Sequence, residues 1–412
     1  MRQTSISTEF AADLTPNGPR EQDADRSSRK PERLRVLHIF NYLGLGGTEL
    51  TALRLITNLD KGGFENRLCG LRGLDAELLA QRFPEADVTA MPDRNGGRFS
   101  ALKKCIRRFK PHIVHSRNWG AIEAVPAARL TGVPIAIHSE HGYEINTVAG
   151  LPLRRRLFRR AVYGMTDVVF TVTQQLREYH AGQAWISPSR IRVIANGIDT
   201  DFFAPRRDVR SRVLEAAGVG KDRFVIGSVG RLVPIKDHGL LLKSAERLSQ
   251  RGVNVHVLLA GSGPELIRHQ EFLKTSGPLA GRVTFLGATD KVPEVMNALD
   301  VFVLTSISEG MSNTLLEAMA CGLPVLATQV GGNTEVVGDP GLCGCLFAPG
   351  DINGLAEQLE RLATDSYARR NMGTAARERA LKMFSMQRMV ENYRHLYLEL
   401  AQRRGLLSRS SV

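Results

Sequence analysis

The chain has 412 residues and a formal net charge of +13, with 43% hydrophobic and 24% charged residues. This length exceeds one ordinary hydrophobic core and favours two domains. No apolar stretch approaches the roughly 18 residues that span a bilayer, which argues against an integral membrane protein. The charge alone is weak evidence for nucleic-acid binding, because interleaved aromatic residues, a recognition-helix pattern and zinc-finger spacing are missing.

The first 33 residues, 1–33, are polar and mixed in charge, without the apolar centre of a secretory signal. We expect a disordered leader there. The five cysteines contain no Cys-x-x-Cys pair, which argues against a disulfide framework and a structural zinc site. A cytoplasmic location fits this pattern. We expect Cys343 and Cys345 to be small packing residues at a strand edge.

Short apolar segments alternate with amphipathic helical segments twice along the chain, which predicts parallel sheets with crossover helices. We therefore expect an α/β fold of two Rossmann-like, doubly wound parallel-sheet domains that face a cleft. The N-terminal domain is expected over 34–205 and the C-terminal domain over 206–385, with a helix in 386–412 that packs back toward the N-terminal domain. The expected strands are 35–40, 113–115, 135–138, 168–172, 191–194, 224–229, 255–260, 283–286, 301–305 and 325–328.

A glycine-rich segment, Gly44-Leu45-Gly46-Gly47-Thr48-Glu49, follows the first expected strand. Ligands of open α/β sheets bind at the carboxyl ends of the strands. Gly46 and Gly47 therefore indicate either a close approach of the backbone to a phosphate or a simple tight turn before a helix that begins near Leu50. The full Gly-x-Gly-x-x-Gly pattern is absent, which disfavours dinucleotide binding.

Five arginines gather in one helical segment of the first half. They favour either a solvated helix face or docking on anionic lipid, since each basic residue at such a surface contributes on the order of 1 kcal/mol. Nucleic acid is the weakest alternative. The five residues are Arg154, Arg155, Arg156, Arg159 and Arg160.

Two cations follow the strand expected at 224–229. Arg231 can grip a phosphate with its planar guanidinium, and Lys236 adds a compact second charge, so the two suit a pyrophosphate. The alternative is a surface ion pair. After the next strand, Gly261 indicates either close backbone approach to a ligand or plain turn geometry.

The most informative segment runs from Ser308 to Pro324, where Glu309 and Glu317 stand eight residues apart. It follows an apolar run at 300–304, which is typical of a strand, and continues with a glycine turn at Gly310 and a helix. At the start of that helix four backbone N–H groups would be free to bind an anion, while the two carboxylates bind hydroxyls. The pattern suits a nucleotide sugar, although Glu309 could instead be a helix cap and Glu317 an exposed carboxylate. The four N–H groups belong to Met311, Ser312, Asn313 and Thr314.

These segments resemble family 4 glycosyltransferases of the GT-B fold, whose signature is a Glu-x7-Glu motif in the C-terminal domain. The likeness extends over 34–400 and includes the glycine loop, the diphosphate clamp of Arg231 and Lys236, and Asn196-Gly197-Ile198-Asp199. Within the family the chain is similar to bacterial sugar transferases linked to exopolysaccharide and PEP-CTERM/exosortase gene clusters. The supporting phrases are His115-Ser116-Arg117-Asn118, Ser139-Glu140-His141-Gly142-Tyr143-Glu144, Lys236-Asp237-His238 and Glu309-Gly310-Met311-Ser312-Asn313-Thr314.

The resemblance implies a retaining transfer that needs no metal and no cofactor besides its co-substrate, a UDP- or GDP-sugar. Glu309 would bind the donor sugar and Glu317 the ribose. Arg231 and Lys236 would stabilise the departing diphosphate, and the backbone at Gly47 would reach the same phosphate.

The resemblance also places His141 in the cleft near the anomeric carbon, whereas its own context equally fits a buried structural histidine. For His115 the same two alternatives are open, an active-site role and a buried structural role. We expect a lipid-linked or saccharide acceptor, no nucleic acid, and a cytoplasmic protein on the inner face of the plasma membrane. The alternatives are a nucleotide-sugar epimerase of the same fold and a basic nucleic-acid-binding or regulatory protein.

Overall fold

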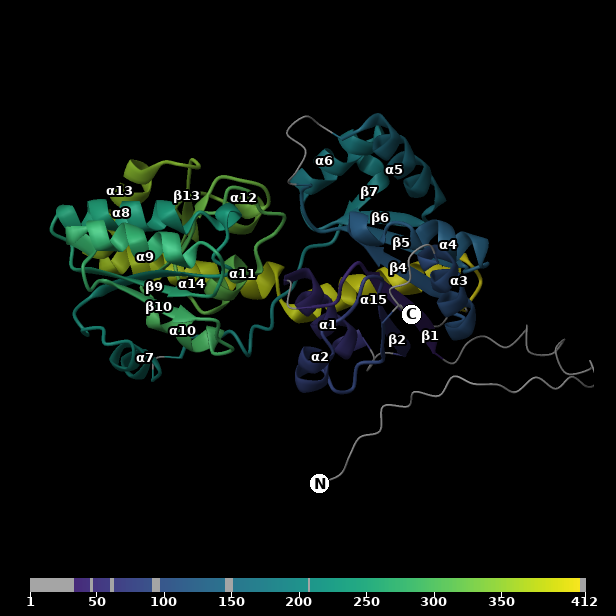
Figure 1. Cartoon of the computed structure of the whole chain (residues 1–412), viewed down its shortest axis with the longest axis horizontal. Helices are drawn as coiled ribbons and strands as arrows, with labels where there is room; N and C mark the ends of the chain where they lie inside the picture. The colour runs from purple at the N-terminus through teal and green to yellow at the C-terminus, as the bar shows by residue number, and fades with distance from the viewer. Residues whose placement is uncertain are drawn as a thin grey trace, which may run out of the picture.

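The structure is a computed structural model that describes residues 33–44, 47–59, 63–90, 97–144, 151–206 and 208–407. The leader expected at 1–33 lies outside the described residues except for its last residue, and so does Gly46. The described residues form two bodies, each built around one parallel sheet (Figure 1). The expected α/β fold of two doubly wound sheets is confirmed.

The N-terminal sheet has seven strands in the order β3-β2-β1-β4-β5-β6-β7, and every neighbouring pair is parallel. Its strands are β1 (Leu34–Phe40), β2 (Phe64–Gly70), β3 (Val88–Ala90), β4 (Ile113–Arg117), β5 (Ile135–Glu140), β6 (Val168–Thr171) and β7 (Ile191–Val193). The helices and 3-10 turns between them are α1 (Gly47–Leu59), α2 (Ala76–Arg82), α3 (Arg98–Phe109), η2 (Trp119–Ala121), α4 (Ala124–Leu130), α5 (Leu153–Met165), α6 (Gln174–Ala184) and η3 (Pro188–Arg190).

The C-terminal sheet has six parallel strands in the order β10-β9-β8-β11-β12-β13. Its strands are β8 (Phe224–Val229), β9 (Val255–Ala260), β10 (Val283–Gly287), β11 (Val301–Leu304), β12 (Val325–Thr328) and β13 (Gly344–Phe347). Around it lie α7 (Arg210–Ala216), η4 (Pro234–Lys236), α8 (His238–Gln250), α9 (Leu266–Thr275), η5 (Gly277–Leu279), α10 (Val292–Ala298), α11 (Asn313–Ala320), α12 (Asn333–Val337), α13 (Ile352–Thr364) and α14 (Ser366–Met383).

Both sheets reverse their strand order at one point, between β1 and β4 in the first and between β8 and β11 in the second. The loops after these four strands therefore diverge at the carboxyl edge of each sheet and leave room for a ligand. Strands such as β9 are buried along their whole length because helices cover both faces of a parallel sheet. Burial on both faces stabilises the two sheets. The candidate site lies in the loops at their carboxyl edges.

The last helix, α15 (Met386–Arg403), returns from the C-terminal body to the N-terminal one (Figure 1). Its Tyr393, Leu396 and Tyr397 pack in the core cluster that contains Val36 of β1 and Phe170 of β6. The segment at Ser385, which leads into α15, lies beside the segment at Gly197, where the chain first passes from the N-terminal body to the C-terminal one. A Cβ on Gly197 would lie 2.7 Å from the carbonyl oxygen of Ser385. Glycine is needed there for the two crossings to pass each other.

Two expectations about elements differ from the structure. The first helix begins at Gly47 rather than near Leu50, and Glu49 thereby lies in its first turn, where a carboxylate is favoured by the helix dipole. Two strands were not expected, β2 and β3, whereas β13 lies where a strand edge was expected at Cys343 and Cys345. The strand β2 carries the polar residues Glu65, Asn66 and Arg67 in its first half, and β3 has only three residues, so neither shows a clear apolar run.

Candidate functional site

An ion pair at the switch point of the C-terminal sheet joins Lys236 and Glu309. Lys236 follows β8 and Glu309 follows β11, and Lys236 Nζ lies 2.5 Å from Glu309 Oε1. Ser306 Oγ donates to the same carboxylate oxygen at 2.6 Å. The two loops are joined by a backbone bond from Ile307 N to Ile235 O at 2.8 Å. The structure thus brings together two residues that the sequence placed 73 positions apart.

The helix α11 begins beside this pair. Ser312 caps it, because its hydroxyl accepts the N–H of Leu315. Asn313 and Thr314 form the first turn, where N–H groups have no partner within the helix. No backbone hydrogen bond to a described residue is recorded for the N–H groups of Met311 and Ser312. These amides lie at the positive end of the helix dipole, and their binding of an anion stays a prediction.

Two of these residues use their side chains to contact the N-terminal body. Met311 Sδ accepts the N–H of Asn196 at 3.3 Å. Asn313 Nδ2 donates to Gly47 O at 3.0 Å and to Thr51 Oγ1 at 2.8 Å. Because these two side chains are engaged in contacts between the bodies, Met311 and Asn313 would contact a donor substrate through their backbone N–H groups. Gly47 lies opposite α11, consistent with a backbone approach to a shared ligand.

Glycine is required where the Glu309 loop meets the N-terminal body. A Cβ on Gly310 would lie 2.2 Å from the carbonyl oxygen of His141, and one on Gly331 would lie 1.8 Å from the carbonyl oxygen of Glu309. Any side chain at Gly310 would force the two bodies apart. His141 and Glu309 therefore border the same interdomain space.

Glu317 lies one turn into α11, within reach of the charge of Arg54 on α1. Burial raises the pKa of Glu317 to about 7, while the charge of Arg54 on α1 opposes part of this rise. A carboxyl group that titrates near neutrality and faces the other body is suited to bind a hydroxyl. Its contact with a ribose stays a prediction.

Arg231 and Gly261 lie in the neighbouring loops of the same sheet. Arg231 is exposed, and its charge acts on Glu49 of the N-terminal body. Gly261 has φ +141°, and a Cβ there would lie 1.8 Å from the carbonyl oxygen of Gly230. Glycine at position 261 is thus needed to pack one strand-end turn on the other. The donor contacts of Arg231 and Gly261 stay predictions.

On the N-terminal side, His141 follows β5 and belongs to a hydrogen-bonded chain of side chains. Ser139 Oγ lies 2.9 Å from His141 Nε2 and 2.9 Å from His115 Nε2. His115 Nδ1 lies 2.8 Å from the hydroxyl of Tyr397 on α15. Burial, assisted by the charge of Arg117, lowers the pKa of His141 to about 3. The ring is therefore neutral at physiological pH.

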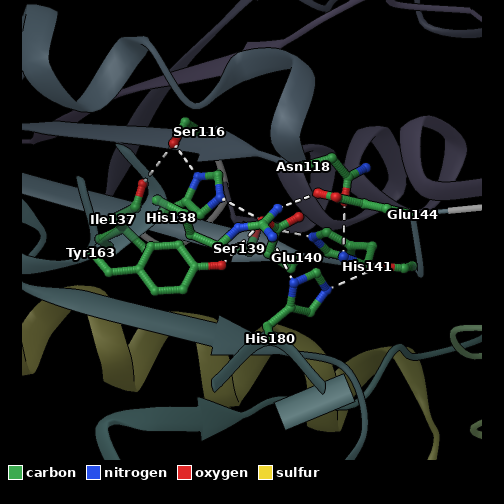
Figure 2. Close-up of polar contacts among 12 residues, drawn as sticks. Ser116, Asn118, Ile137, His138, Ser139, Glu140, His141, Glu144, Tyr163 and His180 are labelled. Carbon is green, nitrogen blue, oxygen red and sulfur yellow. Dashed lines mark hydrogen bonds and ion pairs between the residues drawn. The ribbon is translucent and has the colours of Figure 1, made fainter. Parts of the chain in front are cut away.

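A second polar cluster surrounds Glu140 on the opposite face of β5 (Figure 2). His138 Nε2 lies 3.3 Å and His180 Nδ1 3.8 Å from Glu140 Oε1, and the hydroxyl of Tyr163 donates to this oxygen at 3.1 Å. Burial alone would raise the pKa of Glu140, but the neighbouring histidines and Arg159 hold it well below its usual range. His180 Nε2 donates to Gly142 O at 3.0 Å. The cluster thereby fixes the loop that carries His141.

The structure corrects the prediction for one of the five clustered arginines. Arg159 does not face solvent: its side chain is fully buried and pairs with Glu140 at 3.4 Å and with Glu144. Because α5 packs against the sheet with this side, Arg159 compensates two buried carboxylates and cannot contact a membrane. Arg155 also pairs with Glu144, at 3.2 Å, and its guanidinium lies 4.1 Å from the ring centroid of Trp119.

The other side of α5 faces solvent. Arg154 and Arg160 lie there beside three large apolar side chains: Leu153 is 62% exposed, Leu157 51% and Phe158 43%. The sequence indicated the basic residues of this face but not its apolar ones. A signal was present, since Leu153, Leu157 and Phe158 follow helical spacing with Arg154 and Arg160.

A pocket of about 290 Å³ opens beside His141 in the N-terminal body. Asn118 has φ +59° and ψ 167°, a conformation that costs a non-glycine residue strain, and its Oδ1 accepts the N–H of His141 at 2.8 Å. The strained turn therefore positions His141 at the pocket wall. The lining includes Asn118, Trp119, Glu140, His141, Tyr143 and Glu144.

The chain contains two Asp-x-Asp sequences, Asp23-Ala24-Asp25 and Asp199-Thr200-Asp201, the acidic pattern with which a metal ion could be held. Asp23 and Asp25 lie outside the described residues. In the second, Asp199 Oδ1 accepts the N–H of Asp201 at 3.1 Å and of Phe202 at 2.9 Å, which closes a turn. Within the described part of the chain, no group of three or more His, Cys, Asp or Glu side chains could hold a metal ion. Metal independence stays a prediction.

Comparison with protein families matches both halves of the chain. Residues 45–202 match the model described as Glycosyltransferase Family 4, and residues 223–365 match the model described as Glycosyl transferases group 1. The two matches leave residues 203–222 between them and together span well over half of the chain. The chain belongs to the family 4 glycosyltransferases.

Two curated relatives agree with this assignment, and one solved structure shares the fold. The chain is 29% identical over 310 residues to the putative glycosyltransferase EpsF of Bacillus subtilis, covering 72% of this chain and 79% of the relative. It is 28% identical over 317 residues to UDP-Gal:alpha-D-GlcNAc-diphosphoundecaprenol alpha-1,3-galactosyltransferase of Escherichia coli, covering 73% of this chain and 78% of the relative. The crystal structure of Anabaena HepE in complex with UDP superimposes with a TM-score of 0.77 at 20% identity, covering 89% of this chain and 100% of that chain.

The protein is therefore an enzyme that transfers glycosyl groups, and its two facing Rossmann-like domains form the GT-B fold. The resemblance inferred from the Glu-x7-Glu motif is confirmed. The features that sequence reasoning did not find are the Lys236–Glu309 ion pair, the charge cluster around Glu140 and the contact of Tyr397 with His115.

Proposed function

We propose that this enzyme transfers a sugar from a nucleoside-diphosphate sugar to a lipid-linked or saccharide acceptor, with retention of the anomeric configuration and without a metal. The observation that carries this proposal is the convergence of Lys236, Glu309 and the α11 N-terminus at one switch point, opposite His141. A cation and helix amides suit a diphosphate, and a carboxylate suits sugar hydroxyls.

The donor would separate the resting ion pair. Its diphosphate would take the ammonium group of Lys236, and its sugar hydroxyls would take the carboxylate of Glu309. As the bond between sugar and diphosphate breaks, negative charge grows on the leaving oxygen. Lys236, Arg231 and the α11 amides would stabilise that charge more in the transition state than in the ground state. Glu317 would bind the ribose.

The nucleotide is proposed to be UDP, with GDP as the alternative. The relative from Escherichia coli is named for a UDP-sugar donor and a diphosphoundecaprenol-linked acceptor. That name supports a lipid-linked acceptor here as well, in the assembly of an exopolysaccharide or another cell-surface glycan. The association with PEP-CTERM gene clusters stays a prediction.

The acceptor is proposed to enter the pocket beside His141. This pocket lies in the body opposite the donor residues, and its wall at His141 O meets the Glu309 loop at Gly310. Donor and acceptor would thus approach each other across the contact between the two bodies. Such an arrangement requires the two bodies to open for substrate entry and close for transfer.

The enzyme is proposed to be cytoplasmic and to rest on the inner face of an anionic membrane through α5. None of the described helices is long and apolar enough to cross a bilayer. The exposed face of α5 combines Arg154 and Arg160 with Leu153, Leu157 and Phe158. Such a face suits the boundary between headgroups and acyl chains. Docking there would bring a lipid-linked acceptor close to Trp119, which contacts Phe158 and lines the pocket.

The test starts with a thermal-shift screen of UDP-glucose, UDP-GlcNAc, UDP-galactose and GDP-mannose, because a ligand that binds the folded state raises apparent stability. The stabilising donor is then incubated with a lipid-linked saccharide, with and without excess EDTA. We expect transfer in both, and a product whose anomeric configuration by NMR equals that of the donor. A strict metal requirement or an inverted product would contradict the mechanism, and epimerised free nucleotide sugar would indicate an epimerase.

A further inference from the structure

The side chains between α15 and the cleft form a series of hydrogen bonds. The donor and the acceptor of each bond follow from the chemistry of the groups involved. The series runs from Tyr397 through His115 and Ser139 to His141, with contacts of 2.8, 2.9 and 2.9 Å. Burial lowers the pKa of both His115 and His141, so each ring carries one N–H. The question is which nitrogen of His141 carries the proton.

The direction is set at the α15 end. Arg117 Nη1 donates to His38 Nδ1 at 3.0 Å, and the positive charge of Arg117 also acts on the hydroxyl of Tyr397. A nearby positive charge favours the orientation in which the oxygen of this hydroxyl, and not its proton, faces the guanidinium. Among the described residues, the hydrogen-bond acceptor recorded for the Tyr397 proton is His115 Nδ1. A fully buried hydroxyl without an acceptor is costly, so Tyr397 donates to His115.

The remaining bonds follow from this first one. With Nδ1 of His115 acting as an acceptor, its single proton lies on Nε2 and is donated to Ser139 Oγ. Ser139 is fully buried, and its recorded side-chain contacts with described residues are the two histidine rings. Its own proton therefore goes to His141 Nε2. The proton of His141 must then lie on Nδ1.

His141 Nδ1 is buried and has no hydrogen-bond partner among the described residues. A buried N–H group is rarely left without an acceptor unless a ligand provides one. We infer that Tyr397, acting through His115 and Ser139, holds His141 in the Nδ1–H tautomer and thereby presents a hydrogen-bond donor to an oxygen of the bound substrate. Tyr397, His115 and Ser139 are positioning residues. The tautomer itself follows from the protein alone, whereas its contact with a substrate oxygen rests on the proposed function.

The experiment is a long-range ¹H–¹⁵N correlation spectrum of the full chain labelled with [¹⁵N]histidine, with the His141 signals identified by their loss in His141→Gln. We expect the Nδ1 resonance of His141 in the protonated range and the Nε2 resonance in the unprotonated range. In Tyr397→Phe, which removes only the hydroxyl, His115 can take its proton on Nδ1, and His141 should shift toward the Nε2–H form. A wild-type His141 that carries its proton on Nε2 would overturn the inference, as would an unchanged tautomer in Tyr397→Phe.

Tyr393→Phe is the matched control, because Tyr393 lies one helical turn away on α15 and also faces Arg117 but has no recorded bond to His115 within the described residues. It should leave the His141 spectrum unchanged. Ser139→Ala interrupts the series of hydrogen bonds at a second point. In this variant too, His141 should shift from the Nδ1–H form toward the Nε2–H form. In the transfer assay, Tyr397→Phe should lower kcat on the order of 5-fold, the effect of one hydrogen bond. A changed spectrum without any effect on kcat would retain the tautomer and reject the substrate contact.

Discussion

The ammonium nitrogen of Lys236 lies 2.5 Å from Glu309 Oε1. The two side chains that are expected to bind the nucleotide-sugar donor thus form an ion pair with each other. The serine hydroxyl at position 306 adds a bond to the same oxygen at 2.6 Å. In this resting arrangement the Lys236 side chain is 20% exposed and the Glu309 side chain 11%. A nucleotide sugar can replace the ion pair with two separate interactions, diphosphate on Lys236 and sugar hydroxyls on Glu309. Donor binding is therefore an exchange of partners.

This exchange predicts opposite effects of two substitutions on the binding of UDP. Lys236→Met should weaken UDP binding roughly 10- to 100-fold, because a hydrogen bond to a charged group is lost. Glu309→Gln should leave UDP binding unchanged or tighten it a few-fold, because Lys236 is released from its partner. Isothermal titration with UDP measures both. Equal weakening by the two substitutions would show that the pair acts as a structural unit.

The raised pKa of Glu317 predicts how stability depends on pH. Its folded pKa of about 7 lies above the ordinary value of 4.5, so the folded state binds the proton more tightly. Ionisation of Glu317 should therefore lower the unfolding free energy of the wild type relative to Glu317→Gln as pH rises from about 4.5 to about 7, by at most about 3 kcal/mol. Glu317→Gln removes this dependence and should exceed the wild type in unfolding free energy above pH ~7, but not below pH ~4.5.

Urea unfolding at a series of pH values tests this prediction. The control is Glu357→Gln, which changes an exposed glutamate of α13 in the same domain. Its difference from the wild type should stay within about 0.5 kcal/mol at every pH. A Glu317→Gln difference that does not vary with pH would mean that the carboxyl titrates in its ordinary range.

Arg159 and Arg154 lie on the same helix but should respond differently to removal of their charge. Arg159→Met leaves Glu140 and Glu144 without their buried cation and should lower the unfolding free energy by about 3 to 5 kcal/mol. Arg154→Met, on the solvent side, should change it by less than about 0.5 kcal/mol. Denaturant unfolding compares the two. Similar losses would argue against a buried role for Arg159.

Membrane docking through α5 predicts binding to anionic vesicles. The double variant Arg154→Gln and Arg160→Gln should reduce partition into phosphatidylglycerol vesicles on the order of 30-fold, at about 1 kcal/mol per charge. Cosedimentation measures the bound fraction. The charge-matched control is Lys243→Gln with Arg247→Gln, two exposed cations of α8 in the other body. If both double variants lose binding equally, the attraction comes from net charge and α5 is not the docking face.

The loops of the site could be predicted from the sequence because each one follows an apolar strand. Arg231 and Lys236 follow β8, Glu309 follows β11, and His141 follows β5. In an open parallel sheet all these positions lie at the carboxyl edge, so local pattern and a general rule suffice to gather them. The same reasoning predicted both sheets.

The contacts between these loops could not be predicted, because nothing in the local pattern pairs residues far apart in the chain. Tyr397 lies 282 positions from His115 and resembles any apolar residue of an amphipathic helix. The orientation of the arginines on α5 could not be predicted from the sequence either. Which of five neighbouring arginines faces inward depends on Glu140 and Glu144, whose side chains only the folded sheet brings beneath the helix.

The central claim is that Glu309 grips the sugar being transferred, and the turnover of Glu309→Gln with the donor chosen by the thermal-shift screen tests it most directly. The account predicts that transfer falls by at least ~10²-fold while UDP still binds and Glu357→Gln remains fully active. Near-normal transfer by Glu309→Gln would contradict it.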